Sequence, residues 1–155
     1  FNLNNQSHKV PILTKGGFSE NQIVRPSVQS TKPASTDMVE LPLIDLAWGR
    51  SGDKGDKFNI GIIARRAAYL PYIRNALSEG VVQDWLAHEF EGAANPHVER
   101  FDVPGIHALN FLCHEGLGGG GMASLRLDPL AKGKAQQLLE IPVAIPATLV
   151  KPKSA

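Results

Sequence analysis

The sequence predicts a single α+β domain in which helices gather on one face of an antiparallel or mixed sheet. Expected strands follow one another in hairpin-like pairs, and this order does not match the regular strand–helix alternation of a parallel sheet. Two neighbouring segments in the middle of the chain carry apolar residues at helical spacing. The chain has 155 residues and a hydrophobic fraction of 43%, which suits one globular domain with a modest core.

The composition of the chain changes near residue 38. Residues 1–38 are rich in Asn, Gln, Ser, Thr, Lys and Pro, and they hold too few apolar side chains to bury a core. We therefore expect an extended arm over residues 1–38, a folded domain over residues 39–150 and a tail over residues 151–155. Two apolar stretches of the arm, residues 9–13 and 21–25, are expected to pair with a sheet or to lie on a partner.

Charge and cysteine content narrow the class of protein. Lys and Arg number 16 against 15 Asp and Glu, and this balance favours neither nucleic acid nor an anionic membrane surface as a partner. The single cysteine, Cys113, excludes an internal disulfide and a cysteine-rich zinc site, and it fits a reducing compartment. No apolar run approaches the roughly 18 residues of a transmembrane helix. We expect a cytoplasmic domain, and the initial Phe1 indicates a piece of a longer protein.

Two strands open the folded part. Residues 39–48 and 58–65 are apolar runs with β-branched enrichment. Between them lies "WGRSGDKGDKFNIG", Trp48 to Gly61, which we interpret as a long charged loop because a tight hairpin needs only two turn residues.

Helices are predicted next, over residues 68–78 and 80–90. Pro71 suits a first helical turn, and Gly80 is expected to separate the two pieces.

Two further strands are expected over residues 97–105 and 106–116. The apolar alternation of the first slips near Arg100, which suggests a β-bulge. In the second, Asn110 is a polar side chain in a half-buried strand, so it must be hydrogen-bonded. Its expected role is either to pin a neighbouring loop or to serve a site.

The C-terminal third contains three more predicted elements. Residues 123–128 alternate as a strand, and residues 128–140 form a helix with Asp128 as N-cap and Pro129 in the first turn. Residues 141–150 form an edge strand because their prolines cannot donate to a ladder on both sides. The smallest common fold with this composition of elements is a ferredoxin-like two-layer sandwich.

The charged loop has two interpretations on physical grounds. Its glycines let successive backbone N–H groups form an anion-binding nest, to which Arg50 and Lys54 add charge. Alternatively it is a solvated loop whose Asp and Lys side chains neutralise each other. A second glycine cluster, Gly116 to Gly121, lacks the helix and βαβ context of a dinucleotide fingerprint. It is expected to be a flexible lid or a path for a ligand.

Candidate catalytic groups outside these loops are few. His114 and Glu115 lie at the mouth of the glycine run, where a general acid or base would be useful, although an ordinary strand-end histidine is the simpler interpretation. No pair of His, Asp or Glu falls at a metal-ligand spacing, so we predict no dedicated zinc site. Cys113 is expected to be a packing residue. The residues alone therefore indicate no complete catalytic set.

The chain resembles the small C-terminal domain of the acyclic terpene utilization protein AtuA. The resemblance lies in four stretches taken in order: "PLIDLAWGRSGDKGDKFNIGIIAR", "ALNF", "LGGG" and "SLRLDPLAKGKA". That domain also occurs as a stand-alone partner of the larger AtuA N-terminal domain. The resemblance spans roughly residues 39–146, and its order of motifs is specific, although Asp56, Lys57 and Phe58 depart from the usual pattern. The family's small domain is regarded as ferredoxin-like, in agreement with the fold predicted above.

The resemblance implies a functional role for the first loop. Asp53, Lys54 and Asn110 are the expected catalytic residues, with Asp53 orienting Lys54 or acting as a base and Asn110 fixing the loop. Arg126 and Asp128 are expected to leave the same strand face and to pair with each other or with the Ser51–Lys54 loop. The matching ligand-binding positions are Arg50, Ser51, Gly52, Gly55, Asn59, Gly118, Gly119, Gly120, Arg126 and Asp128.

The resemblance also implies a setting. AtuA proteins resemble components of citronellol and geraniol breakdown, which runs on branched acyl-CoA esters. We expect an acyl-CoA ligand, a lyase- or hydratase-like reaction, and a larger AtuA domain or subunit that completes the site in an oligomer. The alternative function is a non-catalytic module that docks on that larger domain and stabilises it. No cofactor is certain, and the alternative ligand is a divalent cation held by Ser51, Asp53 and Asp56.

Overall fold

The computed structural model describes residues 2–10, 16 and 37–150. Near the N-terminus, β1 (Asn2–Leu3) and β2 (Gln6–Ser7) form a two-residue antiparallel pair. Residues 21–25 and most of residues 9–13, which we expected to pair with a sheet or a partner, lie outside the described residues.

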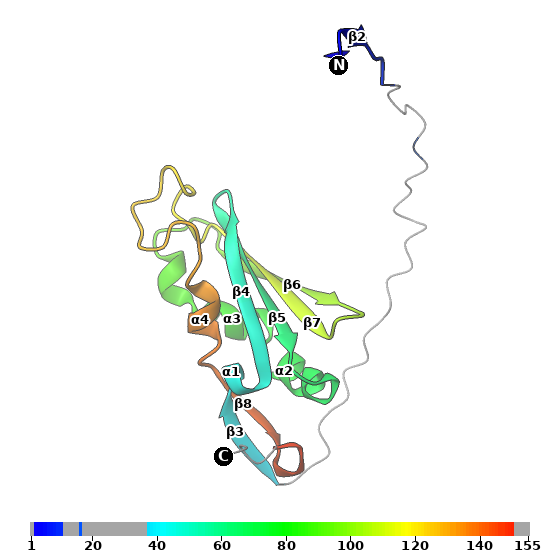
Figure 1. The fold of residues 1–155 in the computed structure, drawn as a ribbon. Coiled ribbons are helices and arrows are strands. Elements are labelled where there is room, and N and C mark those ends of the chain that lie inside the picture. The colour runs from blue at the N-terminus through cyan, green and yellow to red at the C-terminus, as the bar shows by residue number, and fades with distance from the viewer. Residues whose placement is uncertain (1, 11–15, 17–36, 151–155) are drawn as a thin grey trace.

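A four-stranded antiparallel sheet forms the body of the domain (Figure 1). It consists of β4 (Ala47–Lys54), β5 (Lys57–Ala64), β6 (His97–Val103) and β7 (Ala108–His114), in the order β4-β5-β7-β6. All neighbouring strands are antiparallel, so the fold is α+β, as predicted.

A second, two-stranded sheet pairs β3 (Met38–Pro42) with β8 (Pro142–Pro146). The expected strand over residues 39–48 is interrupted, because α1 (Leu43–Leu46) inserts one helical turn between β3 and β4. Leu43 and Leu46 are both buried, and this three-residue spacing on a helical turn points two leucines into the same core. One strand thus becomes two strands in different sheets.

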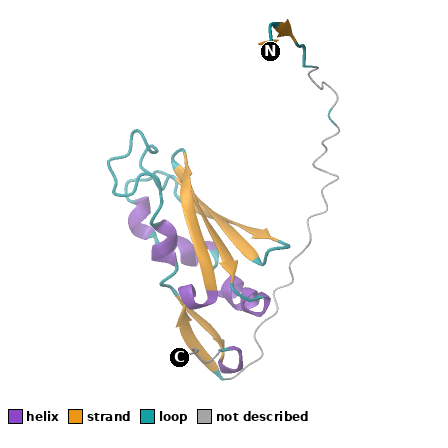
Figure 2. Cartoon of the chain, in the orientation of Figure 1, coloured by secondary structure: helices purple, strands orange, loops and turns teal. Residues whose placement is uncertain are grey.

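Helices lie along one side of the four-stranded sheet (Figure 2). They are η2 (Ala67–Tyr69), α2 (Leu70–Ala76), α3 (Glu79–Trp85), η3 (Ala87–Phe90) and α4 (Lys134–Leu138), and η4 (Ala147–Leu149) follows β8. The helical segments between residues 67 and 90 confirm the predicted pair of helices. Gly80 lies inside α3 and does not separate the two, because the Ser78 hydroxyl caps α3 by accepting a hydrogen bond from the Val81 N–H.

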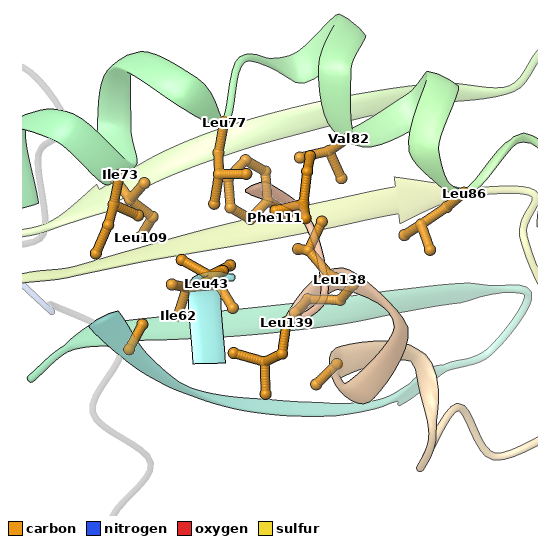
Figure 3. Close-up of a cluster of buried hydrophobic side chains, with 14 of the residues drawn as sticks. Leu43, Ile62, Ile73, Leu77, Val82, Leu86, Leu109, Phe111, Leu138 and Leu139 are labelled. Atoms are coloured by element: carbon orange, nitrogen blue, oxygen red, sulfur yellow. The ribbon is translucent and has the colours of Figure 1, made fainter. Parts of the chain in front are cut away.

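The core lies between the sheet and these helices (Figure 3). Alternate residues of β5 and β7 face it, including Ile62, Leu109 and Phe111, and α2, α3 and α4 contribute leucines, isoleucines and valines from the other side. Phe58 packs against Phe90 of η3 with ring centroids 6.3 Å apart. The core therefore fixes η3 and α4 against the sheet.

The opposite face of the sheet, which we call the outer face, is covered by no described helix. Trp48, Ile63 and Phe101 are 53%, 39% and 48% exposed there. Arg50, Lys54, Asn59, Asn110 and His114 also lie on this face, because side chains alternate along each strand.

Three predictions for residues 97–140 are wrong: the bulge at Arg100, the strand over residues 123–128 and the start of the following helix. β6 pairs with β7 in an unbroken register, so there is no bulge at Arg100. Arg100 faces inward because its guanidinium donates to the carbonyl oxygens of Arg74 and Leu77 at the end of α2. Residues 123–128 form no strand, and α4 begins only at Lys134.

Candidate functional site

The predicted charged loop is in fact a tight hairpin. β4 continues to Lys54, β5 begins at Lys57, and only Gly55 and Asp56 form the turn. Gly55 has a φ of +72°, which suits the first turn position of a type II′ hairpin. Successive residues of this motif consequently point to opposite faces of the sheet. The predicted site residues are therefore divided between the two faces of the sheet.

Ser51 and Asp53 face inward, toward α4. The Ser51 hydroxyl is buried and accepts a hydrogen bond of 2.9 Å from the Ala135 N–H, in the first turn of α4. The Asp53 carboxylate lies 3.8 Å from the Lys132 ammonium. These contacts attach the hairpin to the segment that leads into α4.

Lys54, Asn59 and Asn110 face outward. The Lys54 ammonium donates to the main-chain carbonyl of Asp53, so the Asp53 carboxylate does not orient it as expected. Asn59 donates its amide to the Asn110 side-chain oxygen at 2.9 Å, which confirms that Asn110 is hydrogen-bonded. The side-chain oxygen of Asn59 is buried and has no hydrogen-bond partner among the described residues. Asp53 and the two other predicted catalytic residues therefore occupy different faces.

The two glycine-rich segments contact each other. Asp56 accepts two hydrogen bonds from the glycine run: its carbonyl from the Leu117 N–H at 3.2 Å and its carboxylate from the Gly119 N–H at 2.6 Å. Gly118, Gly119 and Gly120 all have positive φ. A side chain at Gly120 would lie 3.0 Å from the Gly55 carbonyl oxygen. The glycines thus allow the run to lie against the hairpin turn.

Arg126 and Asp128 belong to the loop that follows the glycine run. The Arg126 guanidinium donates to the carbonyl oxygens of Glu89 and Glu91 at the end of η3. The Asp128 carboxylate accepts from the N–H groups of Lys132 and Gly133 at 2.6 and 2.7 Å. The two side chains therefore share no strand face, and these contacts pair them neither with each other nor with the Ser51–Lys54 loop.

A pocket of about 540 Å³ lies between η3, this loop and α4. Its most unusual feature is a buried ion pair: the Lys134 ammonium lies 2.6 Å from the Glu89 carboxylate, and the two side chains are 3% and 7% exposed. The lining residues are His88, Glu89, Glu91, Arg126, Leu127, Asp128, Lys134 and Gln137.

Polar contacts in the pocket converge on one oxygen atom. Oε1 of Glu89 accepts from Lys134 Nζ and from Gln137 Nε2 at 3.2 Å, and it lies 3.2 Å from Nε2 of His88. His88 Nε2 also lies 2.8 Å from the side-chain oxygen of Gln137. His88 is 57% exposed, so an imidazole that contacts the Gln137 side chain and lies beside a buried carboxylate faces solvent. This pairing is one that general acid–base catalysis uses.

A second pocket, of about 350 Å³, adjoins the first. It includes Asp56, Glu115, Gly118 and Gly119, and Arg126 lines both pockets. Glu115 accepts hydrogen bonds from the N–H groups of residues 94 and 95, so its carboxylate orders the loop before β6. Among the ligand-binding positions implied by the family resemblance, Arg126 and Asp128 line the first pocket, and Gly118, Gly119 and Arg126 line the second.

Glu89 and Lys134 were missed by the sequence analysis. A signal was present, since Lys134 shares the buried face of α4 with Ala135 and Leu138. A lysine on an apolar helix face requires a buried partner. That partner, Glu89, lies 45 residues away, and no local pattern indicates it.

A second cluster lies on the outer face. His97, Glu99 and His114 place potential metal-ligand atoms within 4.8 Å of one another. The prediction of no dedicated zinc site used spacing along the chain, whereas these three side chains come from two paired strands. Ligands on different strands become neighbours through strand pairing, which spacing along the chain does not reveal.

Cys113 is buried, and burial raises the pKa of its thiol to about 12. It is a packing residue, as predicted.

The structure therefore shows a small α+β domain with a charged pocket at one end of its sheet. The model of the AtuA ferredoxin-like domain family matches residues 41–144. The chain belongs to this family, and the predicted ferredoxin-like class is confirmed. No curated protein and no solved structure matches the chain significantly. Among the described residues, no helix has both the length and the apolar character needed to cross a membrane.

Proposed function

We propose that this domain contributes an acyl-CoA site to an AtuA-type protein of acyclic terpene breakdown, such as that of citronellol or geraniol, in the cytoplasm. A larger AtuA domain or subunit completes the site, and the reaction is lyase- or hydratase-like. The observation that carries the proposal is the buried Glu89–Lys134 pair in the wall of the 540 Å³ pocket.

The energetics of this pair favour a functional role. Removing two charges from water costs several kcal/mol per ion, and apolar residues of similar volume are often as stabilising. Ionisable groups that converge in a pocket are accordingly candidates for a functional site. Lys134 and Arg126 supply positive charge, while Glu89 supplies a carboxylate.

These groups suit the chemistry of a thioester. Addition or elimination next to a thioester carbonyl needs a base and a positive group near the oxygen that becomes enolate-like. In the proposed arrangement His88 moves the proton, Glu89 orients the imidazole, and Lys134 stabilises the developing negative charge. The hairpin residues Arg50 and Lys54 project from the outer face of the sheet. In the proposed arrangement they hold the phosphates of CoA from that face.

The loop that contributes Arg126 and Asp128 to the pocket also exposes apolar side chains. Leu127 lines the pocket and is 92% exposed, and Met122 and Leu125 on the same loop are fully exposed. Large apolar side chains in such positions mark a surface for a ligand or a partner. A branched acyl chain against this loop would place the thioester near the charged groups.

The alternative function is a docking module, and the outer face favours it. Trp48, Ile63 and Phe101 are exposed on the sheet face that no described helix covers. In this alternative, the larger AtuA domain packs on that face and the small domain only stabilises the assembly.

Three variants of the complete assembly separate these functions, with a thermal-shift titration of branched acyl-CoA esters as the assay. His88→Gln changes an exposed pocket residue, Lys54→Ala changes the hairpin, and Trp48→Ser changes the outer face. We expect the wild-type assembly to be stabilised by the ester and His88→Gln to lose at least tenfold in affinity while remaining assembled. Lys54→Ala should weaken binding only if the hairpin holds the CoA phosphates.

Two results would contradict the proposal. Absence of stabilisation by any CoA ester at saturating concentration would exclude the ligand class. Loss of assembly in Trp48→Ser, together with unchanged ligand response in His88→Gln, would favour the docking function.

A further inference from the structure

We propose that His97, Glu99 and His114 form a binding site for a divalent transition metal, with Zn²⁺ as the best-fitting ion. The three side chains project from the outer face, and their potential ligand atoms all lie within 4.8 Å of one another. This site is separate from the pocket of Glu89 and Lys134, which lies on the helical side of the sheet.

Strand pairing places the ligands together. His97 at the start of β6 lies directly opposite His114 at the end of β7. Glu99 is two residues further along β6 and therefore points to the same face as His97. The two imidazole rings are stacked with centroids 3.8 Å apart. All three ligands thus stand on a rigid two-stranded frame, which preserves their spacing.

His97 is held in a tautomer that suits metal binding. Its Nδ1 lies 3.1 Å from the carbonyl oxygen of Asn95. Because a carbonyl only accepts hydrogen bonds, Nδ1 carries a proton, and in the neutral ring the lone pair is on Nε2. A backbone carbonyl that fixes the non-ligating nitrogen in this way is the usual outer partner of a metal-bound histidine.

His114 and Glu99 are already near ligand geometry. Nε2 of His114 lies 3.0 Å from Oε2 of Glu99, and the His114 side chain is only 13% exposed. Two ligand atoms on a tetrahedral Zn²⁺ lie about 3.4 Å apart, given zinc–ligand distances of about 2.0–2.2 Å. The ion takes the place of the proton between the two atoms, so only small side-chain rotations are needed.

The donor set selects the class of ion. Two imidazoles and one carboxylate are a set that Zn²⁺ binds, with a fourth position left for water. Mg²⁺ and Ca²⁺ prefer all-oxygen sets and are not expected to bind here. Glu99 and His97 are exposed, so the fourth position is open to solvent.

The test uses the full chain after removal of metal with a chelator. Calorimetric titration with ZnCl₂ should give one ion per chain, and Co²⁺ should give the intense visible absorption of a four-coordinate site. His97→Ala, Glu99→Gln and His114→Ala should each weaken Zn²⁺ binding by at least about tenfold. The matched control is His107→Asn, because His107 lies exposed in the turn at the other end of the same hairpin, and asparagine tolerates its positive φ.

Folding is monitored separately by circular dichroism in the presence of chelator. A folded Glu99→Gln protein keeps the test valid even if His114→Ala is unstable. The proposal is overturned if wild-type protein binds no Zn²⁺. It is also overturned if the folded variants bind as tightly as His107→Asn, since the ion would then be held elsewhere on the chain.

Discussion

Gly120 provides a sharp test of the contact between the glycine run and the hairpin. Gly120→Ala places a methyl group 3.0 Å from the Gly55 carbonyl oxygen, closer than the roughly 3.5–4.0 Å of favourable contact. Gly105→Ala is a matched control, because Gly105 has a φ of +95° against +92° for Gly120 but no atom within 4 Å of the added methyl.

The difference between the two variants in free energy of unfolding isolates the cost of the steric clash at Gly120. A non-glycine residue at such a φ costs about 1–3 kcal/mol in backbone strain, and this cost is common to both variants. Overpacking against backbone that cannot rotate away costs about 1–3 kcal/mol more. We therefore expect Gly120→Ala to lower the free energy of unfolding by about 1–3 kcal/mol more than Gly105→Ala does.

Urea unfolding followed by circular dichroism measures both values, and equal slopes with denaturant would show that the unfolded states are comparable. A loss in Gly120→Ala no greater than in Gly105→Ala would refute the reasoning. The glycine run would then not be packed against the turn of the β4–β5 hairpin, and the packing of this contact would not explain its glycines.

Two further predictions concern titratable groups. Hydrogen bonds from Arg74 lower the pKa of Asp102, so this ion pair stabilises the fold above about pH 4 and the contribution is lost as pH falls through the lowered pKa. Because the pair is partly exposed, the free energy of unfolding that is lost at low pH should be small. The Asp102→Asn variant should not show this loss when its unfolding in urea is measured over the same pH range. The Cys113 thiol, with a pKa of about 12, should be only roughly one part in ten thousand thiolate at about pH 8. It should therefore react with a thiol reagent only after denaturation, and rapid labelling of the native protein would contradict its burial.

Local patterns determined the class of the fold and several of its elements. The β-branched run at 58–65 became β5, the apolar spacing at 68–90 became helices, and the apolar stretch around Cys113 became a central buried strand. In each case the side-chain period and the burial of one face are properties of a few consecutive residues. The prolines at 142 and 146 likewise confine β8 to a two-stranded sheet.

The same local reasoning failed where distant partners override the pattern. Leu125 and Leu127 alternate like strand residues, yet both are almost fully exposed because the intervening Arg126 is anchored to η3. At Arg100 the apolar alternation slips for a different reason, since α2 supplies carbonyl oxygens that accept from an inward-facing guanidinium.

The sequence by itself determined an α+β domain and the motifs by which its family is known. Only the tertiary structure decided which of those motifs meet. Tertiary structure turned the charged segment into a hairpin, whose alternation sends Ser51 and Lys54 to opposite faces. It also joined Glu89 to Lys134 and His97 to His114. Such pairs depend on strand register and helix packing between segments far apart in the chain, and these are set by burial of the whole core rather than by neighbouring residues.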